Sequence, residues 1–282
     1  MGDQAETALY LVLGAAFLHA FWNALIKGST DSTLVLGLIS LAHALVGVVM
    51  IFLFLPPAAE SWPFIAASTF IHFFYYVFLL RSYRFGDLSH VYPISRGVAP
   101  VLVTLGAQVF AGETLPLLGW IGVVMVSLGV SMPSLKSGLN SIHPKALISA
   151  IATGIFIASY TVVDGMGVRA SASPFGYIGW LFFLEFIVAG FVFYRRRYQL
   201  QLTSRTVWSV GFIGGIASAG AYGLAIYAKS IAPLGAVSAV RESSVVIAAL
   251  IGIIWFHERP WKIRLISAGI VACGVLVLSK VI

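Results

Sequence analysis

Two arginines stand inside apolar stretches of the sequence, where a permanent charge is costly. Arg96 lies in SHVYPISRGVAP (89 to 100) and Arg241 lies in GAVSAVRESSVV (235 to 246). An ionisable side chain inside a membrane span costs about 2.5 to 3.5 kcal/mol on insertion scales, so it usually faces a protein interior or a wet cavity. A guanidinium can bond the carbonyls of neighbouring helices, grip an anion with two parallel hydrogen bonds, or extend toward the membrane surface. All three roles stay open for these arginines.

Polar and aromatic side chains recur at helical spacing on other apolar stretches. HAFWNALIK places His19 and Asn23 four residues apart, with Trp22 one turn from His19, and such a row either joins helices or lines a water path. His72 shares a face with Tyr76, and such aromatic side chains can bind a small molecule or simply pack.

Buried carboxylates are the candidates for carrying a proton. Glu242 follows Arg241 but points about 100° away from it on a helix, so we expect it to pair with another helix. A carboxylate at depth is either protonated or paired, and the candidates for proton coupling are, in order, Glu242, Glu185 and His19. Asp164 lies near the expected end of its apolar stretch and is interpreted as a solvated acid.

Catalytic and cofactor motifs are missing from the sequence. HERPW (257 to 261) lacks the second histidine of a zinc-protease signature, and the sequence has neither GxSxG nor a phosphate loop. The single cysteine, Cys273, has no partner for a disulfide or a thiolate metal cluster. No basic arm with interleaved aromatics suggests nucleic acid. We therefore expect no enzyme, no cofactor, no metal and no nucleic-acid partner.

The elements that carry these residues are apolar stretches long enough to cross a membrane. The chain is 60% hydrophobic and 10% charged, with a mean hydropathy of +0.98, which indicates an all-α integral membrane protein. Stretches this long are not the short alternating segments of a barrel. The ten expected helices are 7–26, 32–55, 62–83, 88–111, 115–133, 144–163, 174–194, 206–228, 233–255 and 262–280.

An internal repeat relates the two halves of the chain. A shift of 145 places Arg96 on Arg241, Glu113 on Glu258 and Gly129 on Gly274. Because each half has five spans, an odd number, the second copy must enter the membrane in the opposite sense. The sequence thus predicts two inverted five-helix repeats, residues 1–137 and 138–282, with a site near mid-membrane.

The two copies differ around the arginines. Pro93 and Pro100 each free a backbone carbonyl and predict a kink beside Arg96. The second copy has Ser238 and Val245 at the matching positions, so we expect no corresponding kink there.

The cations are divided unequally between the two ends of the predicted helices, which favours both termini outside the cytoplasm. One end receives twelve, Lys27, Arg81, Arg84, Lys136, Lys145, Arg195, Arg196, Arg197, Arg205, Arg259, Lys262 and Arg264, and the other receives three, Arg169, Lys229 and Lys280.

The segments AAFLHAFWNALIK, RSYRFGDLSHVYPISRGVAPVLV, GETL…GWIGVVMVSLGV and HERP…LISAGIVACGVLVL resemble the drug/metabolite transporter superfamily, specifically its EamA-type family. The resemblance covers essentially the whole chain. It implies a ten-helix carrier with both termini in the cytoplasm, opposite to the charge count, and helices 5 and 10 peripheral or at an oligomer contact, as in a homodimer. The binding residues that it supports are Arg96, Arg241, His19, Trp22, Asn23, Tyr76, Tyr92, Tyr160 and Tyr222.

The sequence therefore predicts a secondary transporter for a small polar or amphipathic metabolite, with an amino acid or organic anion favoured by the arginines. We expect it in a membrane, surrounded by lipid, and by the resemblance in the bacterial inner membrane, with protons as a candidate coupling ion. Two alternatives stay open. One is an exporter of amines or cationic drugs that uses Glu242, and the other is a membrane receptor or scaffold that transports nothing.

Overall fold

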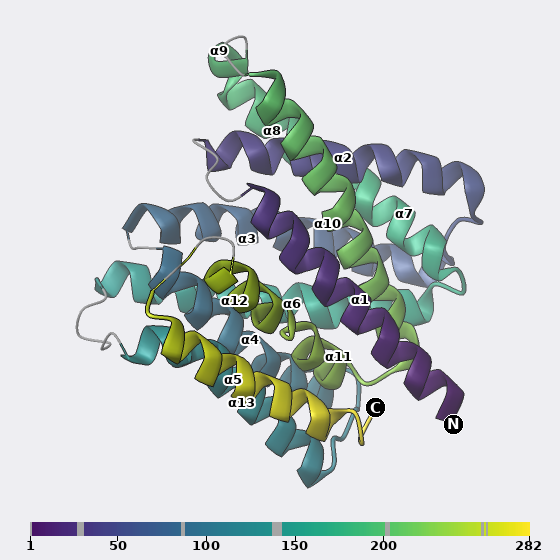
Figure 1. The fold of residues 1–282 in the computed structure, drawn as a ribbon. Helices are drawn as coiled ribbons and strands as arrows, with labels where there is room; N and C mark the ends of the chain where they lie inside the picture. The colour runs from purple at the N-terminus through teal and green to yellow at the C-terminus, as the bar shows by residue number, and fades with distance from the viewer. Residues whose placement is uncertain are drawn as a thin grey trace.

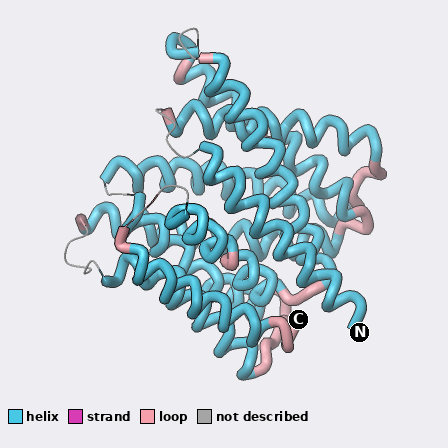
Figure 2. Tube along the Cα trace, viewed as in Figure 1, coloured by secondary structure: helices cyan, strands magenta, loops and turns pink. Residues whose placement is uncertain are grey.

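The computed structural model describes residues 2–26, 31–85, 88–136, 143–200, 204–254, 257 and 259–282, and within these ranges the chain is helical and contains no strand (Figure 1, Figure 2). Lys27 and Glu258 lie outside the described residues. The helices are α1 (Gly2–Ile26), α2 (Ser32–Leu53), η1 (Ala59–Ser61), α3 (Trp62–Phe85), α4 (Leu88–Phe110), α5 (Leu117–Lys136), α6 (Pro144–Ala170), α7 (Pro174–Leu184), α8 (Phe186–Arg195), α9 (Arg197–Leu200), α10 (Arg205–Ile231), α11 (Leu234–Arg241), α12 (Ser244–Ile254) and α13 (Trp261–Leu278).

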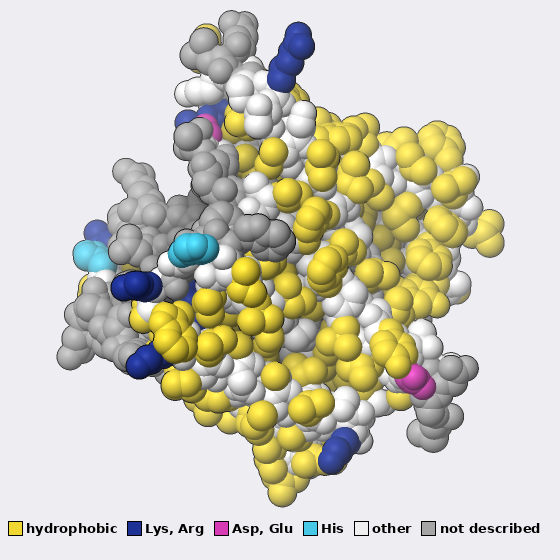
Figure 3. All heavy atoms as spheres, in the orientation of Figure 1, with side chains coloured by type: hydrophobic (Ala, Val, Ile, Leu, Met, Phe, Trp, Pro, Cys, Tyr) yellow, Lys and Arg dark blue, Asp and Glu magenta, His cyan; other side chains and the backbone are white. Residues whose placement is uncertain are grey.

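The ten predicted membrane spans are confirmed. Ten helical segments of the described chain are long and apolar enough to cross a membrane. Hydrophobic side chains cover much of the face seen in Figure 3, while lysines and arginines sit toward its edges. This is the surface expected of a helix bundle whose solvent is lipid.

Two of the spans are interrupted, and a glutamate stands at each interruption. α7 gives way to α8 at Glu185, and α11 gives way to α12 at Glu242 and Ser243. At the second break the amides of Glu242 and Ser243 bond carbonyls only three residues back, at 3.0 and 2.9 Å. A short 3₁₀ turn inside a helix often marks a hinge. Both carboxylates are thus held at places where the backbone departs from the α-helix.

The interrupted backbone that the structure shows lies away from the two prolines of α4. α4 continues through both Pro93 and Pro100 as one helix, and Thr104 Oγ1 donates to the Pro100 carbonyl at 2.9 Å. The break lies in the second copy, which has no proline at the matching positions. There the turn at Glu242 interrupts the helix without any sequence signal for a breaker.

α5 and α13 pack closely through glycines that the shift of 145 relates. A Cβ on Gly129 would lie 2.8 Å from Val271 Cγ2, and a Cβ on Gly274 would lie 2.8 Å from Val126 Cγ2. Val126 and Val271 are themselves 145 positions apart, so the two contacts exchange when the copies are exchanged. α1 also packs along α10 as α3 packs along α6. This reciprocity is expected of two copies related by an approximate two-fold axis.

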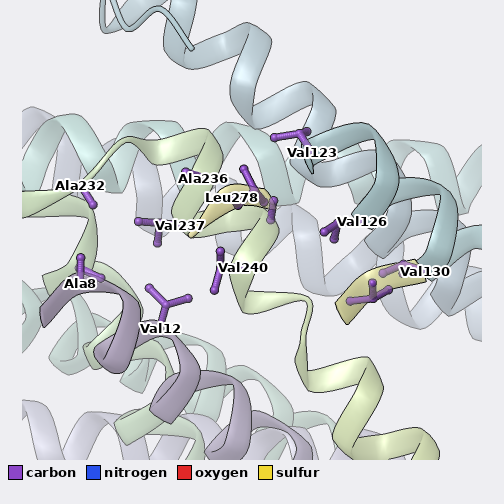
Figure 4. Packing of buried hydrophobic residues seen from close by; sticks show 13 residues of the cluster. Ala8, Val12, Val123, Val126, Val130, Ala232, Ala236, Val237, Val240 and Leu278 are labelled. Atoms are coloured by element: carbon purple, nitrogen blue, oxygen red, sulfur yellow. The ribbon is translucent and has the colours of Figure 1, made fainter. Parts of the chain in front are cut away.

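The largest buried cluster joins both ends of the chain to the middle of it. Ala8 and Val12 of α1 face Val237 and Val240 of α11 in Figure 4, and valines of α5 lie near Leu278 of α13. All members are fully or almost fully buried alanine, valine or leucine side chains, and such packing contacts hold helices together in lipid. The cluster fixes α11, which carries Arg241.

Two of the three cations assigned to the sparse end are not free surface charges. Lys229 is only 1% exposed, which corrects its assignment to a loop, because α10 continues to Ile231. Arg169 pairs with Glu113 at 2.6 Å. At the other end Arg196 also pairs, with Asp31 at 3.6 Å, and the excess of cations that the sequence places at that end remains.

We predict that the C-terminus lies outside the cytoplasm, because the end rich in lysine and arginine stays inside. A periplasmic reporter enzyme fused after Ile282 is expected to be active and a fluorescent protein fused there to be dark. Fusions between α5 and α6, in the basic loop, should give the opposite pair of signals. A bright C-terminal fluorescent fusion would contradict the prediction.

Gly274→Ala is predicted to lower the thermal unfolding midpoint, because the new methyl group would lie 3.0 Å from the backbone of Gly122. Overpacking costs about 1 to 3 kcal/mol, more than the about 1 kcal/mol by which alanine favours a helix over glycine. Gly269, on the same helix, has open space around the same position, so Gly269→Ala is the matched control. Equal midpoints for the two variants would show that the α5–α13 contact tolerates a side chain.

Candidate functional site

Arg96 and Glu242 form an ion pair between α4 and the break after α11. Arg96 Nη2 lies 2.7 Å from Glu242 Oε1, and Arg96 Nε donates to Oε2 at 3.1 Å. The two residues are only 5% and 3% exposed. The direction expected of Glu242, away from Arg241 and toward another helix, is the one observed. The first predicted repeat is therefore tied to the second by a buried two-point contact.

Arg241 is held differently, although the shift of 145 makes it the counterpart of Arg96. It is half-buried, and no described carboxylate lies within ion-pair distance of it. Its Nε is buried and lacks a hydrogen-bond partner among the described residues. The same shift carries Glu242 onto Gly97, which has no side chain to repeat the contact. The repeat thus supplies two guanidinium groups but one matching carboxylate.

Aromatic and polar residues from four helices surround Arg241. Its guanidinium carbon lies 5.8 Å from the centre of the Tyr222 ring, which is within the range of a cation–π contact. His19 on α1 is near enough to both Arg96 and Arg241 for their charges to act on it, and its Nε2 lies 3.3 Å from Tyr92 Oη. Five predicted binding residues, Arg96, Arg241, His19, Tyr92 and Tyr222, therefore meet between α1, α4, α10 and α11.

Trp22 and Asn23 lie beside His19 but differ in how they are engaged. The His19 and Trp22 rings meet edge to face with centres 5.2 Å apart, and the buried indole Nε1 of Trp22 has no partner among the described residues. Asn23 Nδ2 donates to the His19 carbonyl at 2.7 Å. Trp22 thus has a free donor, while one donor of Asn23 is used within its own helix.

A second polar cluster joins α3, α6 and α10 through Tyr222. The ring of His72 stacks on Tyr160 with centres 4.1 Å apart, and His72 Nε2 lies 3.2 Å from Tyr222 Oη. Tyr222 Oη also donates to Asp164 Oδ2, and Tyr177 Oη donates to Asp164 Oδ1 at 3.3 Å. Asp164 is 0% exposed. The interpretation of Asp164 as a solvated acid is wrong, because α6 continues beyond it to Ala170.

Tyr76 and Glu185 form a third, smaller group. Tyr76 Oη donates to Glu185 Oε1 at 3.2 Å, and His43 Nδ1 lies 3.8 Å from the same oxygen. Glu185 is 8% exposed. The structure therefore brings Tyr76 to a carboxylate at the α7–α8 break and not to the arginines.

Glu113 and Arg169 fix the start of α11, at the end of the helix bundle where the two termini lie. Glu113 Oε2 accepts from the Leu234 amide at 2.8 Å, at the end where the helix dipole favours a negative charge. Arg169, paired with Glu113, donates from Nη2 to the Ala232 carbonyl at 2.8 Å. In the sequence, Glu113 is recognisable only as a marker of the repeat and Arg169 only as a topology signal. Their contacts could not be found without the fold.

Neutralising either member of the Arg96–Glu242 pair is predicted to destabilise the protein strongly. Arg96→Gln leaves a buried carboxylate unpaired and Glu242→Gln leaves a buried guanidinium unpaired, and breaking a buried pair costs about 3 to 5 kcal/mol. The double variant removes both charges and should recover much of that loss. Thermal unfolding of the four proteins in one detergent measures the coupling, and losses that simply add would contradict it.

The comparisons with known proteins agree with the fold. Ten apolar helices indicate a multi-pass membrane protein, and residues 144–280 match the EamA-like transporter family, whose members are membrane transporters of small molecules. The match covers 137 of the 282 residues, and it relates this half of the chain to the drug/metabolite transporter superfamily. A solved structure described as "Crystal structure of protein" has a TM-score of 0.74 over 96% of both chains at 15% identity, which shows a shared fold. No curated protein matches the sequence.

Proposed function

We propose that the protein is a secondary transporter for a small metabolite with an anionic group, an amino acid or an organic anion, moved by alternating access in the bacterial inner membrane. The observation that carries the proposal is the difference between the two arginines. Glu242 is bonded directly to Arg96, while no described carboxylate lies within ion-pair distance of Arg241. Arg241 is half-buried and its Nε is buried without a partner among the described residues. A cation withdrawn from water in this way without a counter-ion is unfavourable, so an anionic substrate supplies what the protein lacks there.

The surroundings of Arg241 suit a small anionic molecule. A guanidinium can hold a carboxylate or phosphate with two parallel hydrogen bonds. Trp22 offers an unused donor, and Tyr222 and Tyr160 offer ring faces for an apolar part of the substrate. An amino acid or a small organic anion fits this combination.

The Arg96–Glu242 pair supports alternating access as the mechanism. It spans the two predicted repeats and ends at a 3₁₀ turn, so a rotation of one repeat against the other would pull on a bond at a hinge. Substrate bound to Arg241, on the residue before Glu242, would act on the same turn. Binding and movement then share one short segment.

The pair also weakens the amine alternative. An amine carrier needs an available carboxylate, and Glu242 is bonded to Arg96 through both oxygens. Glu185, with Tyr76, is the acid that such a carrier would use instead. The proposals therefore differ in which residue a substrate requires.

Arg241→Gln is predicted to weaken binding of the transported anion by about thirtyfold or more, because losing one partner of a buried charge pair costs about 2 to 5 kcal/mol. A panel of amino acids, dicarboxylates and phosphonates is screened by thermal shift, since a ligand at 100 times its Kd stabilises by about 2.7 kcal/mol. Hits are then tested for flux in proteoliposomes. Arg205→Gln, which removes an exposed arginine at the start of α10, is the matched control.

Three outcomes would count against the proposal. Anion binding that survives Arg241→Gln unchanged would place the site elsewhere. Stabilisation by amines alone, lost in Glu185→Gln, would favour the amine carrier. Stabilisation without flux of any panel member would favour a receptor.

A further inference from the structure

His72, Tyr222 and Asp164 form a chain of contacts whose hydrogens can be counted. His72 Nδ1 lies 2.8 Å from the Ser68 carbonyl oxygen, and His72 Nε2 lies 3.2 Å from Tyr222 Oη. Tyr222 Oη in turn contacts Asp164 Oδ2. Three helices, α3, α10 and α6, each contribute one member.

The Ser68 carbonyl fixes the form of the histidine. His72 Nδ1 also lies 3.2 Å from Ser68 Oγ, and a hydroxyl can either donate or accept. The carbonyl oxygen is closer and only accepts hydrogen bonds, so it decides the tautomer: His72 Nδ1 carries a hydrogen and donates it. In a neutral imidazole the other nitrogen, Nε2, then has no hydrogen and must accept from Tyr222. Tyr222 has one hydroxyl hydrogen, which can serve His72 or Asp164, but not both.

The three side chains His72, Tyr222 and Asp164 therefore need one proton more than their ordinary forms carry if both contacts are to be hydrogen bonds. If Tyr222 donates to His72, Asp164 must be protonated and donate to Tyr222. If Tyr222 donates to an ionised Asp164, His72 must be an imidazolium that donates to Tyr222. The two arrangements contain the same number of protons and interconvert when Tyr222 passes one proton on and receives another. Without the additional proton, two lone pairs face each other at a buried contact, which costs free energy.

The groups around the chain are mostly cationic or neutral. Lys229 Nζ lies 5.7 Å from the Tyr222 ring centre, is buried, and has no hydrogen-bond partner among the described residues. It can compensate Asp164 after the proton leaves. The other titratable or charged groups that face the chain are His43 on α2, Tyr75 and Tyr76 on α3, Arg96 on α4, Tyr160 on α6, Tyr177 on α7, Arg241 on α11 and Glu242 after it.

We propose that Asp164, Tyr222 and His72 form the binding site of the coupling proton. This site replaces Glu242 and Glu185 as the candidate, because Glu242 is committed to Arg96 and Glu185 to the separate group with Tyr76. The coupling rests on the proposed anion transport, whereas proton binding itself does not. Tyr222 belongs to both sites, since its ring lies under Arg241 and its hydroxyl joins His72 to Asp164.

The charge of the substrate decides the sense of the coupling. An anion bound to Arg241 stabilises a positive charge nearby, so it favours the protonated form of the Asp164–Tyr222–His72 group. By linkage, the bound proton raises the affinity for the anion by the same factor. The proton and the anion are then bound at the same time and cross the membrane in the same direction, as in a symporter. The anion is expected to bind more tightly as the pH falls through the range in which the chain takes up its proton.

The proton site is tested first without any substrate. Infrared difference spectra between high and low pH, recorded on the full chain in lipid, are expected to show a buried carboxylic acid or an imidazolium appearing in one step with a change in a tyrosine mode. Asp164→Asn and His72→Gln should each lose this step. Glu60→Gln, which makes the same acid-to-amide change at an exposed position of η1, should keep it. A step that survives in either Asp164→Asn or His72→Gln would overturn the site.

Coupling is tested in vesicles loaded with a pH dye, using a panel anion that the wild type transports. Proton uptake with the anion is expected in the wild type and is expected to be lost in Asp164→Asn and in Tyr222→Phe, which keeps the ring under Arg241. An unchanged ratio of protons to anions in these variants would overturn the coupling. If the wild type moves no panel anion, the proposed function fails, while the infrared titration still decides whether the proton site exists.

Discussion

The buried contact between Arg96 and Glu242 is the interaction on which the rest of the structure depends. Burying either charge alone would cost too much free energy. As a pair, the two side chains bind α4 to the turn that separates α11 from α12. Glu242 is bonded to Arg96, so Arg241 has no described carboxylate within ion-pair distance, and its guanidinium lies over the Tyr222 ring. The arrangement of one satisfied and one unsatisfied arginine thus follows from a single bond.

The proposed substrate site, the proposed proton site and the interruption after α11 lie next to one another along a short path. Arg241 directly precedes the turn at Glu242, and its guanidinium rests over Tyr222. Tyr222 reaches Asp164 and His72 through one hydroxyl. Coupling over such a distance needs no extended network, because electrostatic attraction and one shared side chain suffice.

The sequence predicts the ten spans well because apolar length is a local property, and it predicts where Arg96 and Arg241 lie because charge at depth is conspicuous. It misplaces Asp164 and Lys229, since both stand close to the expected ends of apolar stretches, and only the packing of α6 and α10 shows that these helices continue. The interruptions at Glu185 and Glu242 have no glycine or proline to announce them. Likewise, the partner of Arg96 depends on how two distant helices meet.

Gly97 has a consequence for how such a protein can change by mutation. A side chain there would come within 2.9 Å of the Ser127 carbonyl, so backbone crowding against α5 keeps the position small. A glutamate in place of Gly97, which would repeat at Arg241 the contact that Glu242 makes with Arg96, is therefore excluded by steric clash. Under the proposed function, the close packing at Gly97 would keep Arg241 available for an anionic substrate, although Gly97 itself does not touch that substrate.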